Sequence, residues 1–275
     1  SLGVLSFLLL LHNSLQRNIL SLKAKTISRM AGTFFSVTLY LAFIFHLAGY
    51  CLRWYIGGRI PLSNGYETMQ FMALCILLIA CLLHRRFSFI LPFGFLLSGF
   101  ALLVSYLGQM NPQITPLMPV LVSPWLSIHV SLIMMSYALL AFIMLNGILA
   151  LCLRKKESEN NVSGNDAIQD NRIEQLTLVS RLLLYPATFF LGAGIFLGAV
   201  WANVSWGRYW AWDPKEVWAL ITFLVYGVAF HSQSLRIFRK PLFFHIYMIL
   251  AFLTVLMTYF GVNYVLGGMH SYANA

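Results

Sequence analysis

The stretch LLLYPATFFLGAGIFLGAVWA, residues 182–202, contains no charged side chain. At a rise of about 1.5 Å per residue, a helix of about 20 residues spans the ~30 Å hydrocarbon core of a bilayer. Inside that core every backbone N–H and C=O group must be paired within the chain, which leaves helices and closed barrels. Because the stretch is continuously apolar rather than alternating, it predicts a transmembrane α-helix and not a barrel strand.

Six further apolar runs accompany this stretch along the chain. They lie near residues 33–52, 66–83, 87–107, 125–153, 216–235 and 242–262. The composition agrees with a membrane protein, since 60% of the residues are hydrophobic and 9% are charged, against roughly 25% charged residues in a soluble domain. We therefore expect an all-α fold, a polytopic transmembrane helix bundle with about seven full spans and an external Trp-rich loop.

The expected domain organisation has two parts. Residues 1–30 form a partial apolar segment followed by a basic amphipathic linker, and residues 31–275 form one transmembrane domain. An inner loop near residues 154–174 is rich in Asn, Ser and acidic residues, and we expect it to be mobile. The first apolar segment, residues 2–11, has about half the length of a span, and no basic segment precedes it. We therefore expect it to be the end of a helix from a longer polypeptide.

The basic residues indicate which way the chain crosses the membrane. The net charge of +10 would suit nucleic acid, but Lys and Arg lie beside the ends of the apolar runs, as the positive-inside rule describes. The predicted spans place 14 of the 18 basic residues on one side. The other side holds Arg53, Arg59, Arg208 and Lys215. We therefore expect this other side to be external, and we expect no nucleic-acid partner.

The four cysteines lie within apolar runs or at their ends, at Cys51, Cys75, Cys81 and Cys152. None of them forms a C-x-x-C pair. This disfavours a thiol relay, and it also disfavours a covalently attached c-type haem, which needs C-x-x-C-H. We interpret the cysteines as small buried hydrophobic side chains.

The stretch WGRYWAWDPKEVW, residues 206–218, holds four of the seven tryptophans, and we name it the Trp-rich loop. Tryptophans at a membrane edge usually form an interfacial belt. This density, mixed with charge and glycine, instead indicates a flat aromatic platform for a flat ligand. Trp206 and Trp210 share a face on a helical turn, whereas Trp210 and Trp212 share a face in an extended segment. Gly207 lets the backbone approach a ligand closely.

Two histidines are expected on the same side as the Trp-rich loop. His129 lies about five residues into the fourth span, about 7 Å below the outer interface, and His270 follows the last span. Taken singly, each histidine could also be an ordinary polar residue at the membrane interface, and that alternative stays open. As a pair, two neutral imidazoles are a common axial set for haem iron.

Haem also suits the other residues of this side. It is an apolar disc that can stack on the tryptophans, and its two carboxylates need cations. The available cations are Arg53, Arg59, Arg208 and Lys215. Asp213 fits the N-cap of the sixth span, with Glu216 completing a capping box. Capping alone could explain Asp213, so contact between Asp213 and the cofactor stays open.

A third histidine is expected far from this outer group. His231 lies about 17 residues beyond Pro214, and so about 25 Å deeper along the sixth span. An ionisable group in a membrane helix is a functional candidate, and snorkelling to the inner interface is the alternative. His46, in the first span, is a further candidate. No special role is expected for three histidines near inner helix ends, His12, His84 and His245.

At these residues the sequence resembles the tryptophan-rich WWD family of haem-handling proteins in cytochrome c maturation. Three further segments are similar to its CcsA/ResC branch, which belongs to the System II pathway. They are LRWYIGGRIPLSNGYE (residues 52–67), SIHVSLIMMSYA (residues 127–138) and GVNYVLGGMHSYA (residues 261–273). The DPKE ending of the Trp-rich loop differs from the CcmC branch. The resemblance covers the chain from about Ala31 onward and implies a CcsA-like haem-handling domain there.

The resemblance implies a set of residues for non-covalent haem b in transit. His129 and His270 would bind the iron of an external haem. His231 matches a membrane-embedded histidine that would bind the iron of a haem arriving from the inner side. The residues expected to surround the external haem are Trp206, Gly207, Trp210, Trp212 and Asp213. No catalytic side chain is expected.

The resemblance also implies a function in cytochrome c biogenesis. The chain would bind haem, convey it to the external side and present it to apocytochrome c, whose CxxCH segment receives the thioether bonds. It would act as a haem transporter or as a component of a cytochrome c synthase (haem lyase) complex, together with a CcsB/ResB-like partner module, rather than as a stand-alone enzyme. We expect it in the bacterial inner membrane, or in a thylakoid membrane if plastid-encoded, and as the C-terminal part of a CcsBA fusion.

Two other functions remain open from the sequence. A quinone-linked b-type cytochrome subunit would use haem only for electron transfer. A transporter without a cofactor would use its tryptophans to bind an organic cation.

Overall fold

The computed structural model describes residues 22–107, 112–114, 122–153, 164–232 and 234–266. Helices dominate these residues, and no β-strand occurs among them. The chain divides into two compact units, Ser1–Leu117 and Met118–Ala275. The prediction of an all-α, multi-pass membrane fold is therefore confirmed.

The described part of the first unit contains three helices, α2 (Leu22–Gly57), α3 (Gly65–Leu83) and α4 (Ile90–Leu107). Helix α3 packs against both α2 and α4. Its close approach to α4 depends on Gly94, because a Cβ atom there would lie 2.5 Å from Ala80 Cβ. Small residues at such crossings let membrane helices pack closely where no hydrophobic effect drives them together.

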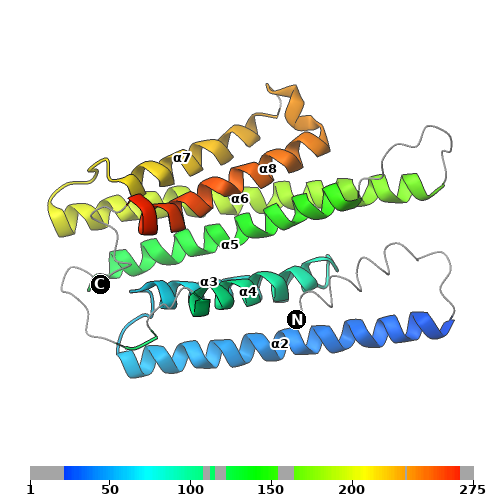
Figure 1. Cartoon of the computed structure of the whole chain (residues 1–275), viewed down its shortest axis with the longest axis horizontal. Helices are drawn as coiled ribbons and strands as arrows, with labels where there is room; N and C mark the ends of the chain where they lie inside the picture. Colours follow the sequence, from blue (N-terminus) through cyan, green and yellow to red (C-terminus); the bar gives the residue numbers. More distant parts are fainter. Residues whose placement is uncertain (1–21, 108–111, 115–121, 154–163, 233, 267–275) are drawn as a thin grey trace. The chain divides into compact units, whose positions relative to one another are not determined.

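Among the residues of the second unit that the structure describes, there are four α-helices and three helices of 3₁₀ or π type. They are α5 (Pro124–Leu153), α6 (Gly164–Trp206), α7 (Pro214–Val228), η2 (Ala229–His231), η3 (Arg236–Arg239), α8 (Pro241–Leu256) and the π-helical η4 (Met257–Leu266). Helix α5 packs along α6 and α8, and α7 packs against α6, α8 and η4 (Figure 1). A buried hydrogen bond from Ser136 Oγ to the Ala187 carbonyl, 2.8 Å long, crosses the α5–α6 interface.

Six helices in the described part of the chain are long and apolar enough to cross a membrane. They are Met30–Gly57, Gly65–Leu83, Ile90–Leu107, Pro124–Leu153, Asn171–Trp206 and Pro241–Asn263. The remaining expected span, residues 216–235, is shorter than predicted, because α7 has 15 residues and then tightens into the 3₁₀ turn η2. The tightening comes where the apolar run gives way to His231 and Ser232.

The expected polar segments are partly helical. Residues 154–163 lie outside the described residues, and from Gly164 onward the expected inner loop belongs to α6. Residues 1–21 also lie outside them, and from Leu22 onward the expected basic linker is continuous with α2.

Candidate functional site

His129 packs against a glycine face of α6. Helix α5 begins at Pro124, since proline suits the first position of a helix, and His129 follows in its second turn. A Cβ atom on Gly198 would lie 2.7 Å from His129 Cε1, and one on Gly194 would lie 2.6 Å from Ile133 Cδ1. These two glycines, four residues apart, give α6 a small-residue face that makes room for the imidazole.

The hydrogen bond of His129 determines which ring nitrogen carries the proton. Its Nδ1 atom lies 2.6 Å from the Gly194 carbonyl oxygen. A carbonyl oxygen only accepts, so Nδ1 carries the proton, and in the neutral ring Nε2 carries the lone pair. This orientation by a backbone carbonyl is common for histidines that bind metals. The side chain is half-buried, and its Nε2 chemistry suits an axial ligand of haem iron.

The start of the Trp-rich loop is set by the end of α6. This helix ends at Trp206, and Gly207 then takes a left-handed conformation with φ 73°. The Gly207 N–H donates to the Asn203 carbonyl at 2.8 Å, which closes the helix in the manner of a glycine C-cap. The Trp201 ring contacts Trp206 edge to face, with ring centroids 4.8 Å apart. Trp201 is only 2% exposed, and its support of the loop was not predicted from the sequence.

The rings of the Trp-rich loop do not form the flat platform expected from the sequence. Trp206 and Trp210 do not share a helical turn, because the helix ends at Trp206. Trp210 and Trp212 do not share a face, because Trp212 has a positive φ of 57°. Their ring planes stand at 87°, with centroids 6.0 Å apart, and Trp212 is 74% exposed. The pair forms a corner of two perpendicular rings.

Asp213 caps α7, as predicted. Its side chain accepts a hydrogen bond from the Lys215 N–H at 3.1 Å, and Glu216 completes the capping box. Glu216 Oε2 accepts from the Asp213 N–H at 3.3 Å and also from the Ala211 N–H at 2.8 Å. Glu216 therefore holds the end of the Trp-rich loop as well as the helix start.

Lys215 contacts the last helical segment. Its Nζ atom donates to Asn263 Oδ1 of η4 at 2.9 Å. Burial lowers the pKa of Lys215 to about 8, against an opposing effect of the nearby Asp213 carboxylate. From the sequence, Lys215 was expected to be a cation for a propionate, and its contact with η4 was not predicted.

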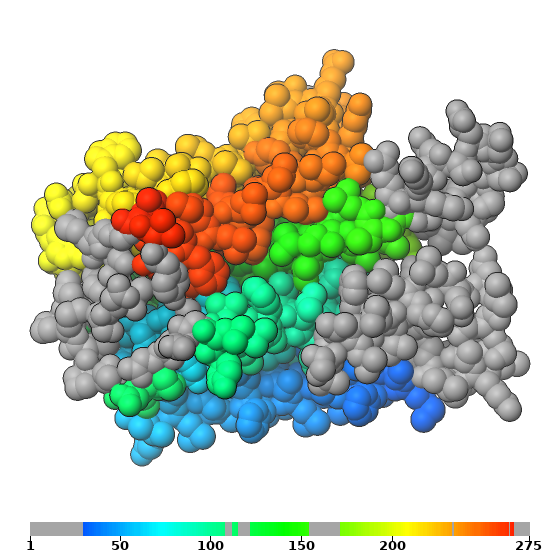
Figure 2. Space-filling model, viewed as in Figure 1, coloured from blue at the N-terminus to red at the C-terminus, as the bar shows by residue number. Residues whose placement is uncertain are grey.

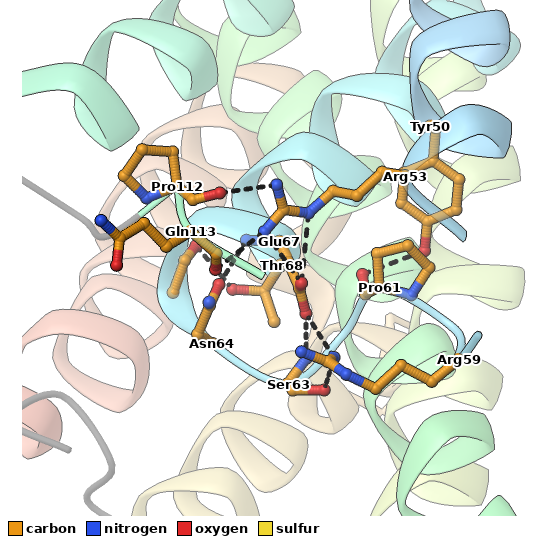
Figure 3. Close-up of polar contacts among 11 residues, drawn as sticks. Tyr50, Arg53, Arg59, Pro61, Ser63, Asn64, Glu67, Thr68, Pro112 and Gln113 are labelled. Atoms are coloured by element: carbon orange, nitrogen blue, oxygen red, sulfur yellow. Dashed lines mark hydrogen bonds and ion pairs between the residues drawn. The ribbon is translucent and has the colours of Figure 1, made fainter. Parts of the chain in front are cut away.

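Arg53 and Arg59, also expected to serve propionates, both bind Glu67 within the first unit (Figure 3). Glu67 is 1% exposed and lies 3.0 Å from Arg53 Nη2 and 3.0 Å from Arg59 Nη1. Its carboxylate also accepts from the Ser63 N–H at 2.8 Å, while Asn64 Oδ1 accepts from the Glu67 N–H at 2.8 Å. These two arginines therefore organise the connection between α2 and α3.

The same cluster reaches beyond this connection. Arg53 Nη1 donates to the Pro112 carbonyl at 2.7 Å, and Tyr50 Oη donates to the Pro61 carbonyl at 3.1 Å (Figure 3). In the sequence, the acidic Glu67 stands near Arg53 and Arg59. Only the two arginines were interpreted, as cations for haem propionates, and Glu67 was given no role.

His231 lies in η2, at the opposite end of α7 from Asp213. Its side chain is exposed, and its Nδ1 donates to the Gly227 carbonyl at 3.2 Å. The lone pair of the neutral ring is therefore again on Nε2. Figure 2 shows the yellow connection between α6 and α7 and the orange atoms around η3 well apart on the surface of the second unit. His270 lies outside the described residues.

The other described histidines have contacts within the protein. His46 Nε2 lies 2.9 Å from the Gln70 carbonyl, and His84 Nδ1 lies 3.0 Å from the Ala80 carbonyl. His245 is fully buried, and its Nε2 lies 2.9 Å from Thr177 Oγ1, which joins α8 to α6. Among the described residues, no group of three or more His, Cys, Asp or Glu side chains could hold a metal ion.

Comparison with known proteins shows one family. Residues 62–270 match the family model described as Cytochrome C assembly protein. NrfI of Wolinella succinogenes is 39% identical over 234 residues, which cover 85% of this chain and 25% of NrfI. CcsA of Chlamydomonas reinhardtii is 38% identical over 232 residues, covering 80% of this chain and 63% of that protein. CcsA of Guillardia theta is 35% identical over 241 residues, covering 80% and 79%. The chain thus spans less than two thirds of the first two relatives.

Proposed function

The chain belongs to the family of CcsA-type cytochrome c assembly proteins, and we propose that it binds haem b and presents it outside the membrane to apocytochrome c. Haem, when bound, supplies the vinyl groups to which the thiols of the substrate add. The contribution of this chain is to hold and orient the iron and one face of the disc.

The orientation of His129 carries this proposal. An axial ligand must offer a lone pair, and its other nitrogen is usually held by an acceptor. His129 meets both requirements through the Gly194 carbonyl, and Gly198 leaves space for the ring. His270 is the proposed second ligand. The substrate histidine would replace one of these two imidazoles when the haem is transferred.

The Trp-rich loop supplies the aromatic contact in this proposal. Trp210 and Trp212 form a perpendicular corner that can cover one face and one edge of a flat ring system. The contact between Trp201 and Trp206 supports the loop at one end, and the capping box of Asp213 supports it at the other. Arg208 is exposed on the same loop, and we assign it to a haem propionate.

His231 is the proposed ligand for haem that enters from the inner side. It is exposed and offers Nε2, while α7 separates it from the Trp-rich loop. The positive-inside distribution supports this assignment of sides. A CcsB-like module would supply the second ligand at this inner position.

The test measures haem bound to the full chain purified from membranes. Soret absorbance and haem per protein are compared for the native chain and for His129→Ala, His270→Ala and the double variant. We expect the low-spin spectrum of two imidazole ligands to be lost in each variant. His84→Ala serves as the matched control, because His84 contacts only its own helix turn and Tyr40 among the interactions described.

Two results would contradict the proposal. If the double variant bound as much haem as the native chain, with an unchanged spectrum, His129 and His270 would not form an external haem site. Haem that is reduced by quinol but never transferred to a CxxCH peptide would favour an electron-transfer subunit instead.

A further inference from the structure

Asn146 of α5 and His245 of α8 are buried polar side chains that both reach helix α6. Each of them is 0% exposed. Asn146 Nδ2 donates to Ser180 Oγ at 3.1 Å, and His245 Nε2 lies 2.9 Å from Thr177 Oγ1. Since Thr177 and Ser180 are three residues apart, they lie on one face of α6. Three helices of the second unit therefore direct polar groups into one region of its core.

Helices α5 and α8 also approach each other closely at this depth. A Cβ atom on Gly147, the residue after Asn146, would lie 3.1 Å from the His245 carbonyl oxygen. Asn146 and His245 therefore reach the same face of α6 from two helices that touch at the same level. Because both side chains are fully buried, neither bulk water nor lipid contacts them.

The hydrogen bonds to α6 use the donor group of each side chain. Thr177 has one hydroxyl proton, which it donates to the Ile173 carbonyl oxygen at 2.8 Å. Thr177 Oγ1 therefore accepts from His245 Nε2, so the lone pair of the neutral ring is on Nδ1. Asn146 donates through Nδ2, which leaves its Oδ1 as an acceptor. Within the part of the chain that the structure describes, neither of these two acceptor atoms has a hydrogen-bond partner.

These two acceptors indicate what kind of ligand suits the region. Buried polar atoms in proteins are almost always satisfied, either by the protein or by an ordered water, and polar side chains inside membrane helix bundles usually have partners. Two acceptors cannot satisfy each other. A ligand that satisfies both must donate two hydrogens, and the close approach of α5 and α8 favours a small one.

A neutral ligand suits the region better than a cation does. Two neutral acceptors are too few to replace the hydration shell of a metal ion. The region also has a positive charge nearby, because the guanidinium of Arg181, the residue after Ser180, lies over the ring of Phe244, 4.6 Å from its centre. Phe244 directly precedes His245 in α8. A second positive charge would be repelled.

We infer that Asn146 Oδ1 and His245 Nδ1 bind one water molecule, which donates a hydrogen bond to each and so joins α5 to α8. Water has the two donors that the acceptors require, and buried waters of this kind belong to the structure of a protein. The side chains by themselves join α5 to α6 and α8 to α6. The water would complete the polar contact among the three helices, and the inference does not depend on haem.

The first test observes the His245 ring by NMR in the full chain, reconstituted in lipid with isotope-labelled histidine. We expect an unprotonated Nδ1 and transfer of magnetisation from water protons to this ring, although the side chain is fully buried. His245→Gln identifies the signal by removing it. A protonated Nδ1 in the neutral ring, or no transfer from water in the native chain, would overturn the inference.

Two variants show whether Asn146 holds the same water. Asn146→Leu removes one of the two acceptors, so the transfer to the His245 ring should be lost or strongly reduced. Ser136→Ala is the matched control, because Ser136 is buried in the same α5–α6 interface but donates directly to the Ala187 carbonyl. It should leave the transfer unchanged. Equal transfer in the native chain and in a folded Asn146→Leu protein would overturn the inference.

The second test measures the coupling between the two side chains by thermal unfolding in detergent. Among the hydrogen bonds of the described residues, none joins Asn146 directly to His245. His245→Gln keeps an amide donor for Thr177 but removes Nδ1, and Asn146→Leu removes Oδ1. Each variant should lower the unfolding midpoint. The double variant should lower it by less than the sum of the two shifts, because both remove the same water.

The control pair combines Ser136→Ala with His245→Gln, whose shifts should add, because Ser136 has its own carbonyl partner. Additive shifts for Asn146→Leu and His245→Gln would overturn the inference even if water reached the His245 ring, because separate waters would not couple the two side chains. Neither test requires bound haem, so their outcomes are independent of the proposed function.

Discussion

His129 Nδ1 donates a hydrogen bond to the Gly194 carbonyl oxygen across the α5–α6 interface, over 2.6 Å. The contact joins a side chain in the second turn of α5 to the backbone of α6. It therefore fixes both the direction of the imidazole and the nitrogen that carries its proton. The glycines that allow this approach are as important to the proposed site as the histidine itself.

Gly198→Ala is expected to displace the His129 ring. The new Cβ would lie 2.7 Å from Cε1, and such overpacking typically costs about 1–3 kcal/mol. Thermal unfolding and the low-spin fraction of bound haem should both decrease. Gly99→Ala in α4 is the control, because a Cβ there meets nothing within 4 Å. Equal behaviour of the two variants would show that the ring is not held by this contact.

Glu216→Ala is expected to loosen the Trp-rich loop. It removes the acceptor for the Ala211 and Asp213 N–H groups and so half of the capping box. The loss should be about 0.5–2 kcal/mol, as for other helix caps. Tryptophan fluorescence should shift toward the spectrum of more exposed indoles. Glu216→Gln keeps an acceptor at the same position and should retain most of the native signal.

Glu67→Ala is expected to destabilise the first unit strongly. It leaves Arg53 and Arg59 without their shared carboxylate, and breaking a buried ion pair costs about 3–5 kcal/mol. Because both arginines are partly exposed, we expect the stability lost in Glu67→Ala to be near the lower end of that range. The measurement is thermal denaturation in detergent. Leu82→Ala, at an exposed position, is the control. If Glu67→Ala lowered the stability no more than Leu82→Ala does, Glu67 would not stabilise the first unit through its two arginines.

Lys215 is expected to make stability depend on pH in a specific window. Its pKa is about 8 in the folded protein against an ordinary value of 10.5, so between these values the unfolded chain binds more protons. Stability should therefore rise as the pH increases from about 8 to about 10. Lys215→Met should lack this component of the profile. Parallel profiles for the two proteins would show that Lys215 is not desolvated as the structure indicates.

The sequence was sufficient for features that depend on local periodicity and capping. Six of the seven expected spans coincide with long apolar helices, and Asp213 with Glu216 caps α7 as predicted. The glycine face of α6 is of the same kind, since Gly194 and Gly198 lie four residues apart. Each of these follows from residues that are close in the chain.

Features that depend on one backbone torsion, or on a partner in another helix, could not be predicted from the sequence. Trp212 has a positive φ, its ring stands at 87° to that of Trp210, and no spacing rule predicts either value. Asn263, the partner of Lys215, is 48 residues away in the chain, and Glu67, the partner of Arg53, belongs to the next helix, so both basic residues were interpreted as free cations. The early end of α7 likewise depends on a tightening of the helix that an apolar count does not reveal.

His129 and His231 are both held through Nδ1 by backbone carbonyl oxygens. In the neutral form, each ring therefore has its proton on Nδ1 and its lone pair on Nε2. The two histidines are thus the same tautomer, although they lie in different helices. A ligand that binds to the lone pair of either ring would meet the same ring atom at both positions.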